Sequence, residues 1–358
     1  MMNKFHTLKI KEVTAETDQA VTLALEIPAD LSETFRFVPG QYLTLRTEID
    51  GEDIRRAYSI CSLAGKDLRV GIKKVEGGRF STHAQSLKAG DEIQVLPPQG
   101  LFACSCDPDA KRSILLIAAG SGITPVLSIA SHVLETEPGT SVTLIYGNRS
   151  TGSIMFRTAL EELKDTHLER FHMHHVLSRE TQDVDLFSGR VDAGRISAMT
   201  QKGLLDPTNE DAIYICGPAE MSLELSSHFE SLGVGKERVH VELFEVPGDD
   251  RPRKANEAVR KRVEEGVQID VILDGLRKQV SLTNPDHTVL DAAQAGGLDL
   301  PFSCAGGMCA TCRCRIIEGE GEMDKNFSLA DWELEDGYVL CCQLRPKSGK
   351  LVIDFDAA

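Results

Sequence analysis

The chain has 358 residues, a length that predicts two or three domains. Apolar residues make up 41% and charged residues 26% of the sequence, which is typical of globular proteins and excludes disorder along the whole chain. The formal net charge of −16 argues against nucleic acid or an anionic membrane as the main partner. No apolar run reaches the roughly 18 residues that cross a bilayer, and the N-terminus lacks a secretory signal. We therefore expect a soluble, cytoplasmic protein.

Residues 1–108 alternate apolar and polar side chains with a period of two, most clearly over 21–27 and 68–72. Turn signals at Asp50-Gly51, Gly77-Gly78 and Pro97-Pro98 separate these short runs. The pattern predicts an antiparallel β-barrel or sandwich, of which we expect the barrel.

Residues 109–246 change to a repeated strand-then-helix pattern, which predicts a parallel sheet with right-handed crossovers. The expected strands cover 114–119, 141–146, 171–177, 212–216 and 238–244. The first expected helix follows strand 114–119 and ends near residue 137, and the others cover 154–165, 193–200 and 219–232.

Residues 247–265 are polar and charged, with little to bury, and are predicted to form a linker. Residues 266–358 begin with an apparent hairpin over 268–273 and 279–282, followed by a helix over 289–294. We thus expect a multidomain chain, and its last part carries the most specific motif.

Six of the ten cysteines fall between residues 304 and 342. Cys304-x4-Cys309-x2-Cys312, followed after 29 residues by Cys342, has the spacing of plant-type [2Fe–2S] proteins. Two bridged irons need thiolates from different directions, which a glycine-containing loop and a distant strand can supply. Cys341 is the competing fourth ligand, and Cys314 is expected to point away. The alternative site is structural zinc, although zinc sites more usually provide a second close cysteine pair. Residues 266–358 resemble a plant-type ferredoxin, and this resemblance implies a β-grasp fold.

A glycine-containing loop follows the first strand of the middle region. Gly120, Gly122, Thr124 and Pro125 lie in a Gly-x-Gly segment that opens a helix, where free amides favour a pyrophosphate. Alone, this segment could equally mark tight strand-to-helix packing. Cys216, Gly217 and Pro218 end a later strand, in the crevice where such sheets bind ligands.

Two arginines favour NADPH over NADH. No acidic residue follows the second strand of this region to hold a ribose 2′-hydroxyl. The second strand ends instead in Arg149-Ser150 and the third in Ser178-Arg179, and arginines suit a 2′-phosphate. The alternative is that both arginines are ordinary solvated surface residues.

The motifs Arg-Arg-Ala-Tyr-Ser at 55–59 and Gly-Gly-Arg-Phe-Ser at 77–81, with Pro39–Tyr42, resemble the ferredoxin–NADP reductase superfamily over residues 1–246. The resemblance implies that Arg56 pairs with the flavin phosphate, that Tyr58 lies against the isoalloxazine and that Ser59 lies near N5. It places Gly78 and Ser81 at the pyrophosphate. Ser59, Cys216, Glu242 and Phe244 are the implied residues at the nicotinamide–flavin junction, and the remaining implied cofactor contacts are Ala57, Ile72, Lys73 and Phe80.

Four stretches, at 4–6, 55–61, 146–150 and 318–326, extend the likeness along the chain. Over its whole length the chain resembles the reductase subunits of phenylacetyl-CoA epoxidase complexes. Its order of modules implies an FAD-binding β-barrel domain (1–108), an NAD(P)-binding α/β domain (109–246), a linker (247–265) and a ferredoxin domain (266–358). The resemblance implies electron flow from NADPH through FAD and [2Fe–2S] to a di-iron oxygenase partner, and the acidic ferredoxin domain is predicted to steer docking. FMN in place of FAD, NADH in place of NADPH, a Rieske-type or steroid oxygenase as the partner, and a redox sensor without turnover remain alternatives.

Overall fold

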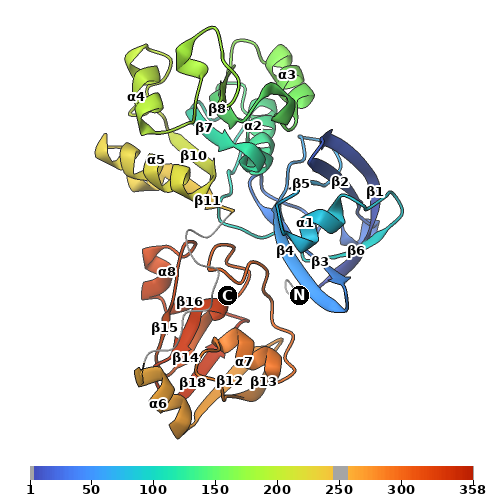
Figure 1. Ribbon diagram of the computed structural model, residues 1–358, viewed down its shortest axis with the longest axis vertical. Coiled ribbons are helices and arrows are strands. Elements are labelled where there is room, and N and C mark those ends of the chain that lie inside the picture. The colour runs from blue at the N-terminus through green and yellow to red at the C-terminus, as the bar shows by residue number, and fades with distance from the viewer. Residues whose placement is uncertain (1–3, 245–256, 358) are drawn as a thin grey trace. The chain divides into compact units, whose positions relative to one another are not determined.

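The computed structural model describes residues 4–244 and 257–357, which form two compact units, one before residue 245 and one after residue 256 (Figure 1). Residues 247–256 of the predicted linker lie outside the described residues. The N-terminal unit contains two modules, each with its own sheet, and the C-terminal unit is a third module.

The first module of the N-terminal unit is an antiparallel sheet in the order β4-β3-β6-β1-β2-β5. A bridge between Ile60 and Val70 joins its two ends, so the sheet curls into the predicted barrel. Leucine, isoleucine and valine side chains fill its interior, as the alternation predicts. The elements are β1 (His6–Thr17), β2 (Ala20–Glu26), β3 (Tyr42–Ile49), β4 (Glu52–Ser59), β5 (Arg69–Lys73), α1 (Arg79–Ala84) and β6 (Glu92–Val95).

The second module is a parallel sheet in the order β11-β10-β7-β8-β9, with helices packed on it (Figure 1). Its central strand β7 is apolar and almost wholly buried, as expected for a strand covered on both faces. The elements are β7 (Ser113–Ala119), α2 (Ile123–Thr136), β8 (Ser141–Asn148), α3 (Arg157–Thr166), β9 (Phe171–Leu177), α4 (Ala193–Gln201), β10 (Ala212–Gly217), α5 (Ala219–Ser231) and β11 (Val239–Leu243).

The C-terminal unit has a five-stranded sheet in the order β13-β12-β18-β14-β16, in which β12 and β18 run parallel. This mixed sheet with α7 packed on it is the predicted β-grasp arrangement. The elements are α6 (Glu257–Glu265), β12 (Val267–Leu273), β13 (Leu276–Leu282), α7 (Val289–Ala295), β14 (Arg313–Glu318), β15 (Gly321–Met323), α8 (Asp331–Glu335), β16 (Tyr338–Leu340), β17 (Leu344–Pro346) and β18 (Lys350–Asp354).

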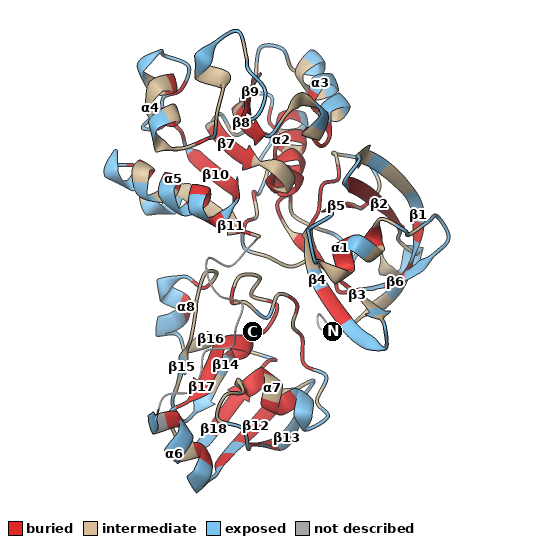
Figure 2. Cartoon of the chain, in the orientation of Figure 1, coloured by how far each residue is buried: buried red, intermediate tan, exposed pale blue. Residues whose placement is uncertain are grey.

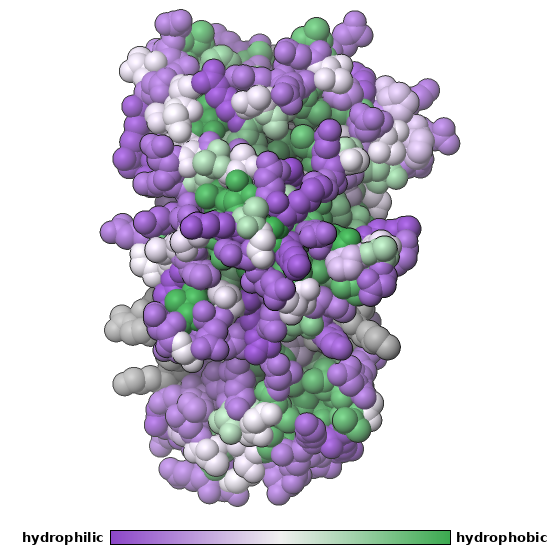
Figure 3. Space-filling view, turned by 90° about the vertical axis from the view of Figure 1, so that its right-hand side faces the viewer, coloured by the Kyte–Doolittle hydropathy of each residue, from purple (hydrophilic) through white to green (hydrophobic). Residues whose placement is uncertain are grey.

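Burial follows the strands in all three modules, and the outer faces of the helices are exposed (Figure 2). Helix α6 lies within the stretch predicted as linker, yet its Val259 and Val263 are buried in the core of the C-terminal unit. The face drawn in Figure 3 is mostly hydrophilic, with smaller apolar patches. None of the described helices is long and apolar enough to cross a membrane.

Candidate functional site

The end of β4 presents one arginine that is not neutralised. Arg55 is buried, pairs with Asp53 at 2.8 Å and stacks on Phe5. Arg56 is exposed, and its guanidinium donates to the Arg55 carbonyl oxygen at 2.7 Å but meets no carboxylate in the described part of the chain. Successive side chains of a strand point to opposite faces, so Arg55 is buried in a structural ion pair whereas Arg56 is exposed and available to an anion.

The turn before α1 is tightly shaped around its serine. The Ser81 hydroxyl accepts from the Val75 amide at 3.1 Å and donates to the Gly78 carbonyl oxygen at 3.3 Å. A Cβ on Gly78 would lie 2.5 Å from this hydroxyl oxygen, so a side chain there would fill the turn. Because the first amides of a helix lack helical acceptors, the turn fits an anionic group such as a pyrophosphate. The rings of Tyr58 and Phe80 lie 5.4 Å apart beside it.

The barrel meets the parallel sheet of the second module, called the nucleotide sheet below, at three residues that were predicted to lie at the nicotinamide–flavin junction. Ser59 donates to Glu242 Oε2 at 3.0 Å, although 183 positions separate the two residues. Cys216 and Glu242 are partners in the β10–β11 register, and Cys216 Sγ lies 4.0 Å from the same carboxylate oxygen. Burial raises the pKa of Glu242 to about 8, partly offset by the hydrogen bond from Ser59. Phe244, just after β11, packs at the edge of the adjoining core.

The loop between β7 and α2 packs against the end of β10. Gly120–Gly122 form a single 3-10 turn, and α2 begins at Ile123. A Cβ on Gly122 would lie 2.0 Å from the Cys216 carbonyl oxygen, so only glycine allows this approach. Thr124 Oγ1 donates to the Ser121 carbonyl oxygen at 3.0 Å. The predicted Gly217 and Pro218 follow Cys216 at this sheet edge, and Pro125 is buried in the first turn of α2.

The ammonium group of Lys73 faces this loop, and the charge of Arg149 acts on it. Lys73, which follows the buried Ile72 on β5, has its Nζ 3.5 Å from the position that a Cβ would take on Gly120. Burial lowers the pKa of Lys73, and the positive charge of Arg149 lowers it further. Neither cation has an ion-pair partner among the residues that the structure describes. Two like charges that act on each other are costly unless an anion joins them, so Lys73 and Arg149 suit a phosphate.

The ends of β8 and β9 bring the two predicted arginines next to each other in the backbone. The Arg179 amide donates to the Arg149 carbonyl oxygen at 2.8 Å, and the Ser178 amide donates to the Asn148 carbonyl oxygen at 2.9 Å. Both arginine side chains and Ser178 are exposed, and Ser150 is half-buried. Glu180 was not among the predicted site residues, although it follows Arg179 directly; it tethers the β8–α3 loop by accepting from the Thr151 amide and hydroxyl, each at 2.7 Å.

In the C-terminal unit the four predicted iron ligands come together as two pairs. The thiol of Cys304 contacts that of Cys309, and the thiol of Cys312 contacts that of Cys342. No three His, Cys, Asp or Glu side chains within residues 4–244 and 257–357 are grouped to hold a single metal ion. Two thiol pairs suit two bridged irons with two protein ligands each, whereas structural zinc needs all four ligands around one point.

Backbone and side-chain donors surround these sulfurs. The Gly306 amide donates to Cys304 Sγ at 3.4 Å and the Thr311 hydroxyl to Cys309 Sγ at 3.1 Å. Gly307 has a φ of +80°, which lets the loop close against the segment that carries Phe327. Such donors stabilise thiolates, the form that binds iron.

Gln343 and Thr311 were not predicted as site residues. Gln343 Nε2 lies 3.6 Å from Cys342 Sγ and donates to the Ala305 carbonyl oxygen at 2.9 Å, so it joins the fourth thiol to the loop. No spacing rule marks a donor of this kind, and only its place beside Cys342 could have indicated it.

The extra thiol next to the fourth predicted ligand points elsewhere. Cys341 is fully buried and contacts the equally buried Cys314 of β14. Its amide donates to the Cys312 carbonyl oxygen at 3.0 Å, which fixes the backbone and turns the next side chain, Cys342, toward Cys312. The geometry therefore favours Cys342 over Cys341.

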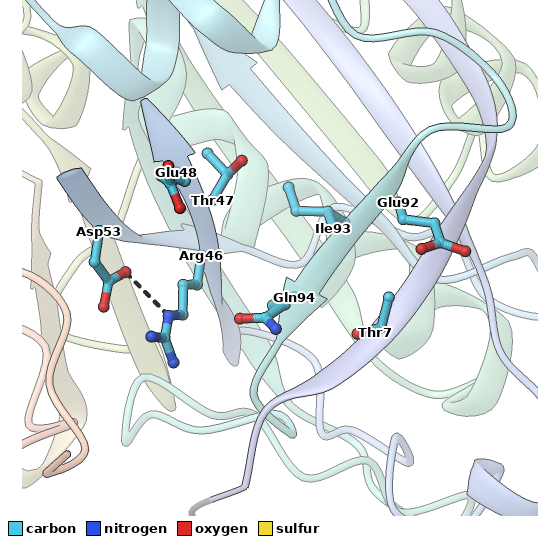
Figure 4. Close-up of a pocket in the computed structure, with 8 residues that line it drawn as sticks. All are labelled: Thr7, Arg46, Thr47, Glu48, Asp53, Glu92, Ile93 and Gln94. Carbon is cyan, nitrogen blue, oxygen red and sulfur yellow. Dashed lines mark hydrogen bonds and ion pairs between the residues drawn. The ribbon is translucent and has the colours of Figure 1, made fainter. Parts of the chain in front are cut away.

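A surface hollow of about 480 Å³ on the barrel contains none of the predicted site residues (Figure 4). It is lined by residues of β1, β3, β4 and β6, and its Arg46 is paired with Asp53 at 3.0 Å. Because its Arg46 is already neutralised, the hollow differs from the surfaces around Arg56 and Lys73, whose cations have no carboxylate partner among the described residues.

Three family models match the chain in succession. Residues 7–104 match the oxidoreductase FAD-binding domain, residues 116–226 the oxidoreductase NAD-binding domain and residues 271–347 the 2Fe-2S iron-sulfur cluster binding domain. FAD and a [2Fe–2S] cluster are thus the cofactors of this architecture, and the chain is an NAD(P)H-type oxidoreductase.

Relatives match the chain from end to end. A 1,2-phenylacetyl-CoA epoxidase subunit from Escherichia coli is 41% identical, covering 99% of each chain. The ferredoxin reductase component of 3-ketosteroid-9-alpha-monooxygenase from Mycobacterium tuberculosis is 34% identical, covering 98% of this chain and 95% of its own. The solved structure of phthalate dioxygenase reductase shares the fold, with a TM-score of 0.59 and 21% identity over 98% of each chain. The chain belongs to the family of oxygenase reductase components that carry FAD-binding, NAD-binding and [2Fe–2S] domains in one polypeptide.

Proposed function

We propose that this chain transfers electrons from NADPH through FAD and a [2Fe–2S] cluster to an oxygenase component, and that this component is the di-iron epoxidase of phenylacetyl-CoA. The supporting observation is the 41% identity to the Escherichia coli 1,2-phenylacetyl-CoA epoxidase subunit across 99% of both chains. Bound FAD supplies the ability to accept electrons in a pair and release them singly, which matches a nicotinamide donor to a one-electron cluster. Cytoplasmic conditions would keep all ten cysteines out of disulfides, including the four that would ligate iron.

In this proposal the barrel holds FAD through residues of β4, β5 and the turn before α1. Arg56 pairs with the flavin phosphate, and Gly78 and Ser81 shape the turn around the pyrophosphate. Tyr58, with Phe80 behind it, supports the isoalloxazine, and Ser59 lies at its reactive edge. Ala57 near the end of β4 and Ile72 near the end of β5 would contact the flavin through their backbone and by packing. The exposed arginine and the glycine turn provide charge-assisted donors for phosphate oxygens.

The nucleotide sheet would hold NADPH between Lys73 and the Gly120–Gly122 loop. Lys73 and the start of α2 (Thr124, Pro125) meet the pyrophosphate, and Arg149, Ser150, Ser178 and Arg179 meet the 2′-phosphate. The nicotinamide would be bordered by Cys216, Gly217, Pro218, Glu242 and Phe244. Burial favours the neutral carboxyl of Glu242 and the protonated thiol of Cys216, so neither adds negative charge beside the nicotinamide.

In the C-terminal unit Cys304, Cys309, Cys312 and Cys342 would ligate the two irons. The paired thiols and the amide donors around them support this set. The unit would dock on the oxygenase by its acidic surface, since residues 266–358 hold 15 acidic and 8 basic residues.

The test is anaerobic purification followed by flavin extraction and by iron and sulfide analysis. We expect one FAD, two irons and two sulfides per chain, and bleaching by NADPH at lower concentration than by NADH. Addition of a phenylacetyl-CoA epoxidase oxygenase should then make NADPH oxidation depend on phenylacetyl-CoA. The second candidate function is reduction of a steroid oxygenase, which the 34% identity to the steroid monooxygenase reductase favours. It would be supported if NADPH oxidation were coupled to substrate with a steroid oxygenase but not with the epoxidase oxygenase. Reduction that stops after one equivalent with either oxygenase would contradict both.

A further inference from the structure

One carboxylate that is not itself a predicted cofactor contact ties the barrel to the nucleotide sheet. Glu16, near the end of β1, accepts from the hydroxyl of Thr22 through Oε1 at 2.8 Å. Its other oxygen, Oε2, accepts from the backbone amide of Phe156 at 3.3 Å, across 140 positions of sequence. One oxygen is thus fixed within the barrel while the other holds the loop that precedes α3.

Phe156 is held in a backbone conformation that a phenylalanine seldom adopts. Its φ of +57° and ψ of +28° are left-handed, and it lies immediately before α3, so its amide has no acceptor within that helix. Such conformations persist where surrounding contacts determine them. The contacts around Phe156 are the Glu16 carboxylate at the amide and the burial of the ring.

The ring of Phe156 reaches the barrel at a glycine. A Cβ on Gly71 of β5 would lie 2.9 Å from Phe156 Cζ and 2.8 Å from Thr124 Cγ2. Thr124 lies in the first turn of α2, which follows the Gly120–Gly122 loop, and Lys73 lies two residues beyond Gly71. The same contact therefore sets the distance between the loop and the strand that carries Lys73.

A second hydrogen bond carries this placement into the loop. Tyr146 is fully buried, and its hydroxyl donates to the Gly120 carbonyl oxygen at 2.9 Å. Both Tyr146 and Phe156 belong to the core beneath α2. A shift of Phe156 relative to the barrel would thus be transmitted to the loop as well as to Thr124.

We infer that Glu16 is a positioning residue, which sets the nucleotide sheet against the barrel so that the nicotinamide reaches the flavin. This inference rests on the proposed NADPH-to-FAD transfer. Hydride transfer is sensitive to small errors in the placement of the reacting atoms, whereas binding of the nucleotide through its phosphates is less so. Loss of Glu16 should accordingly lower the rate of flavin reduction more than the affinity for NADPH.

The experiment is anaerobic stopped-flow reduction of the full-length holoprotein by NADPH, with flavin content measured in the same samples. Glu16→Ala should lower the limiting rate of flavin bleaching by roughly 10- to 100-fold with less than about a threefold change in Kd for NADPH. Glu16→Gln keeps an acceptor oxygen and should recover much of that rate. Gly71→Ala forces Phe156 and Thr124 outward and should reproduce the defect by an independent route.

Glu26→Ala is the matched control, because Glu26 is an exposed carboxylate of the same barrel with no hydrogen bond or ion pair among the described residues. It should bleach at the wild-type rate. A wild-type rate per bound flavin in Glu16→Ala would overturn the inference, and so would a loss explained wholly by lower FAD content, which would indicate a structural role. Failure of the wild-type protein to bleach with NADPH would instead refute the proposed function itself.

Discussion

Three of the four predicted iron ligands lie within nine residues, whereas the residues predicted to hold flavin and nucleotide extend from Arg56 to Phe244. In the C-terminal unit a single loop supplies three of the four predicted ligands, and the four thiols lie as the pairs Cys304–Cys309 and Cys312–Cys342. In the N-terminal unit the site exists only because two modules pack together, as the Ser59–Glu242 hydrogen bond shows. The first site should therefore fail by loss of single ligands and the second by loss of alignment.

The largest expected effect concerns the fourth thiol. Cys342→Ser should abolish the visible absorption of the cluster and electron transfer to one-electron acceptors such as cytochrome c, while NADPH still bleaches the flavin. The reason is that Cys342 is the thiol in direct contact with Cys312, whereas Cys341 contacts Cys314. Iron analysis and optical spectra of the purified variant measure this.

Cys341→Ser is the control for that variant and should retain two irons per chain. If Cys341→Ser lost the cluster and Cys342→Ser kept it, the paired arrangement of the thiols would not describe the iron-bound protein.

This contrast also explains what the sequence could and could not predict. The cluster loop was predictable because its geometry is local, and the residues at the ends of β7 and β10 were predictable because parallel strand ends share one sheet edge. The residues of β4, an antiparallel strand, were indicated only by the Arg-Arg-Ala-Tyr-Ser motif. Glu16, Gln343 and Thr311 were not, since each acts through a contact that no motif or period marks. The final turn before α3 also differs: a helix was expected from residue 154, but the left-handed Phe156 delays α3 to Arg157.

A second prediction tests the basis for NADPH preference. Arg149→Ala should lower kcat/KM with NADPH by about 10- to 100-fold, the effect of losing a charge-assisted hydrogen bond, and leave that with NADH nearly unchanged. Arg157→Ala, which removes an exposed arginine paired with Glu161 on α3, should alter neither. Equal losses with both nucleotides would mean that Arg149 contacts a part that NADH shares, such as the pyrophosphate beside Lys73.

A third prediction concerns pH and the junction between the modules. The pKa of Glu242 is raised from 4.5 to about 8 by burial, so its carboxyl is neutral below about pH 8 and charged above. A negative charge there disfavours addition of electrons nearby, so flavin reduction should slow several-fold as pH rises past 8. Glu242→Gln should remove this decline, as measured by stopped-flow reduction across pH 6.5–9.5, about 1.5 units to either side of that pKa.

Stability gives an independent check on the same group. The folded chain keeps a proton on Glu242 that the unfolded chain releases, so its contribution to stability falls as pH rises from 4.5 to about 8. Glu242→Gln should therefore raise Tm relative to wild type at pH 8.5 and above, and the exposed Glu237→Gln should not. A pH profile unchanged by Glu242→Gln would place the titrating group elsewhere.

The smallest expected effect lies on the surface of the C-terminal unit, where no alignment of modules is involved. Asp331 and Glu335 on α8 are exposed and have no cation partner within the described residues, whereas Glu333 between them is buried against Arg313. Neutralising the two exposed carboxylates (D331N/E335Q) should lower kcat/KM for the oxygenase by a few-fold at low salt, and the difference should vanish near 0.5 M salt, where the Debye length is roughly 4 Å. Because both residues lie beyond the cluster loop, iron content and flavin reduction should stay at wild-type levels. A salt-independent loss would indicate a specific contact, and no loss at any salt would remove α8 from the docking surface and leave the acidic charge of the unit without a local role in steering.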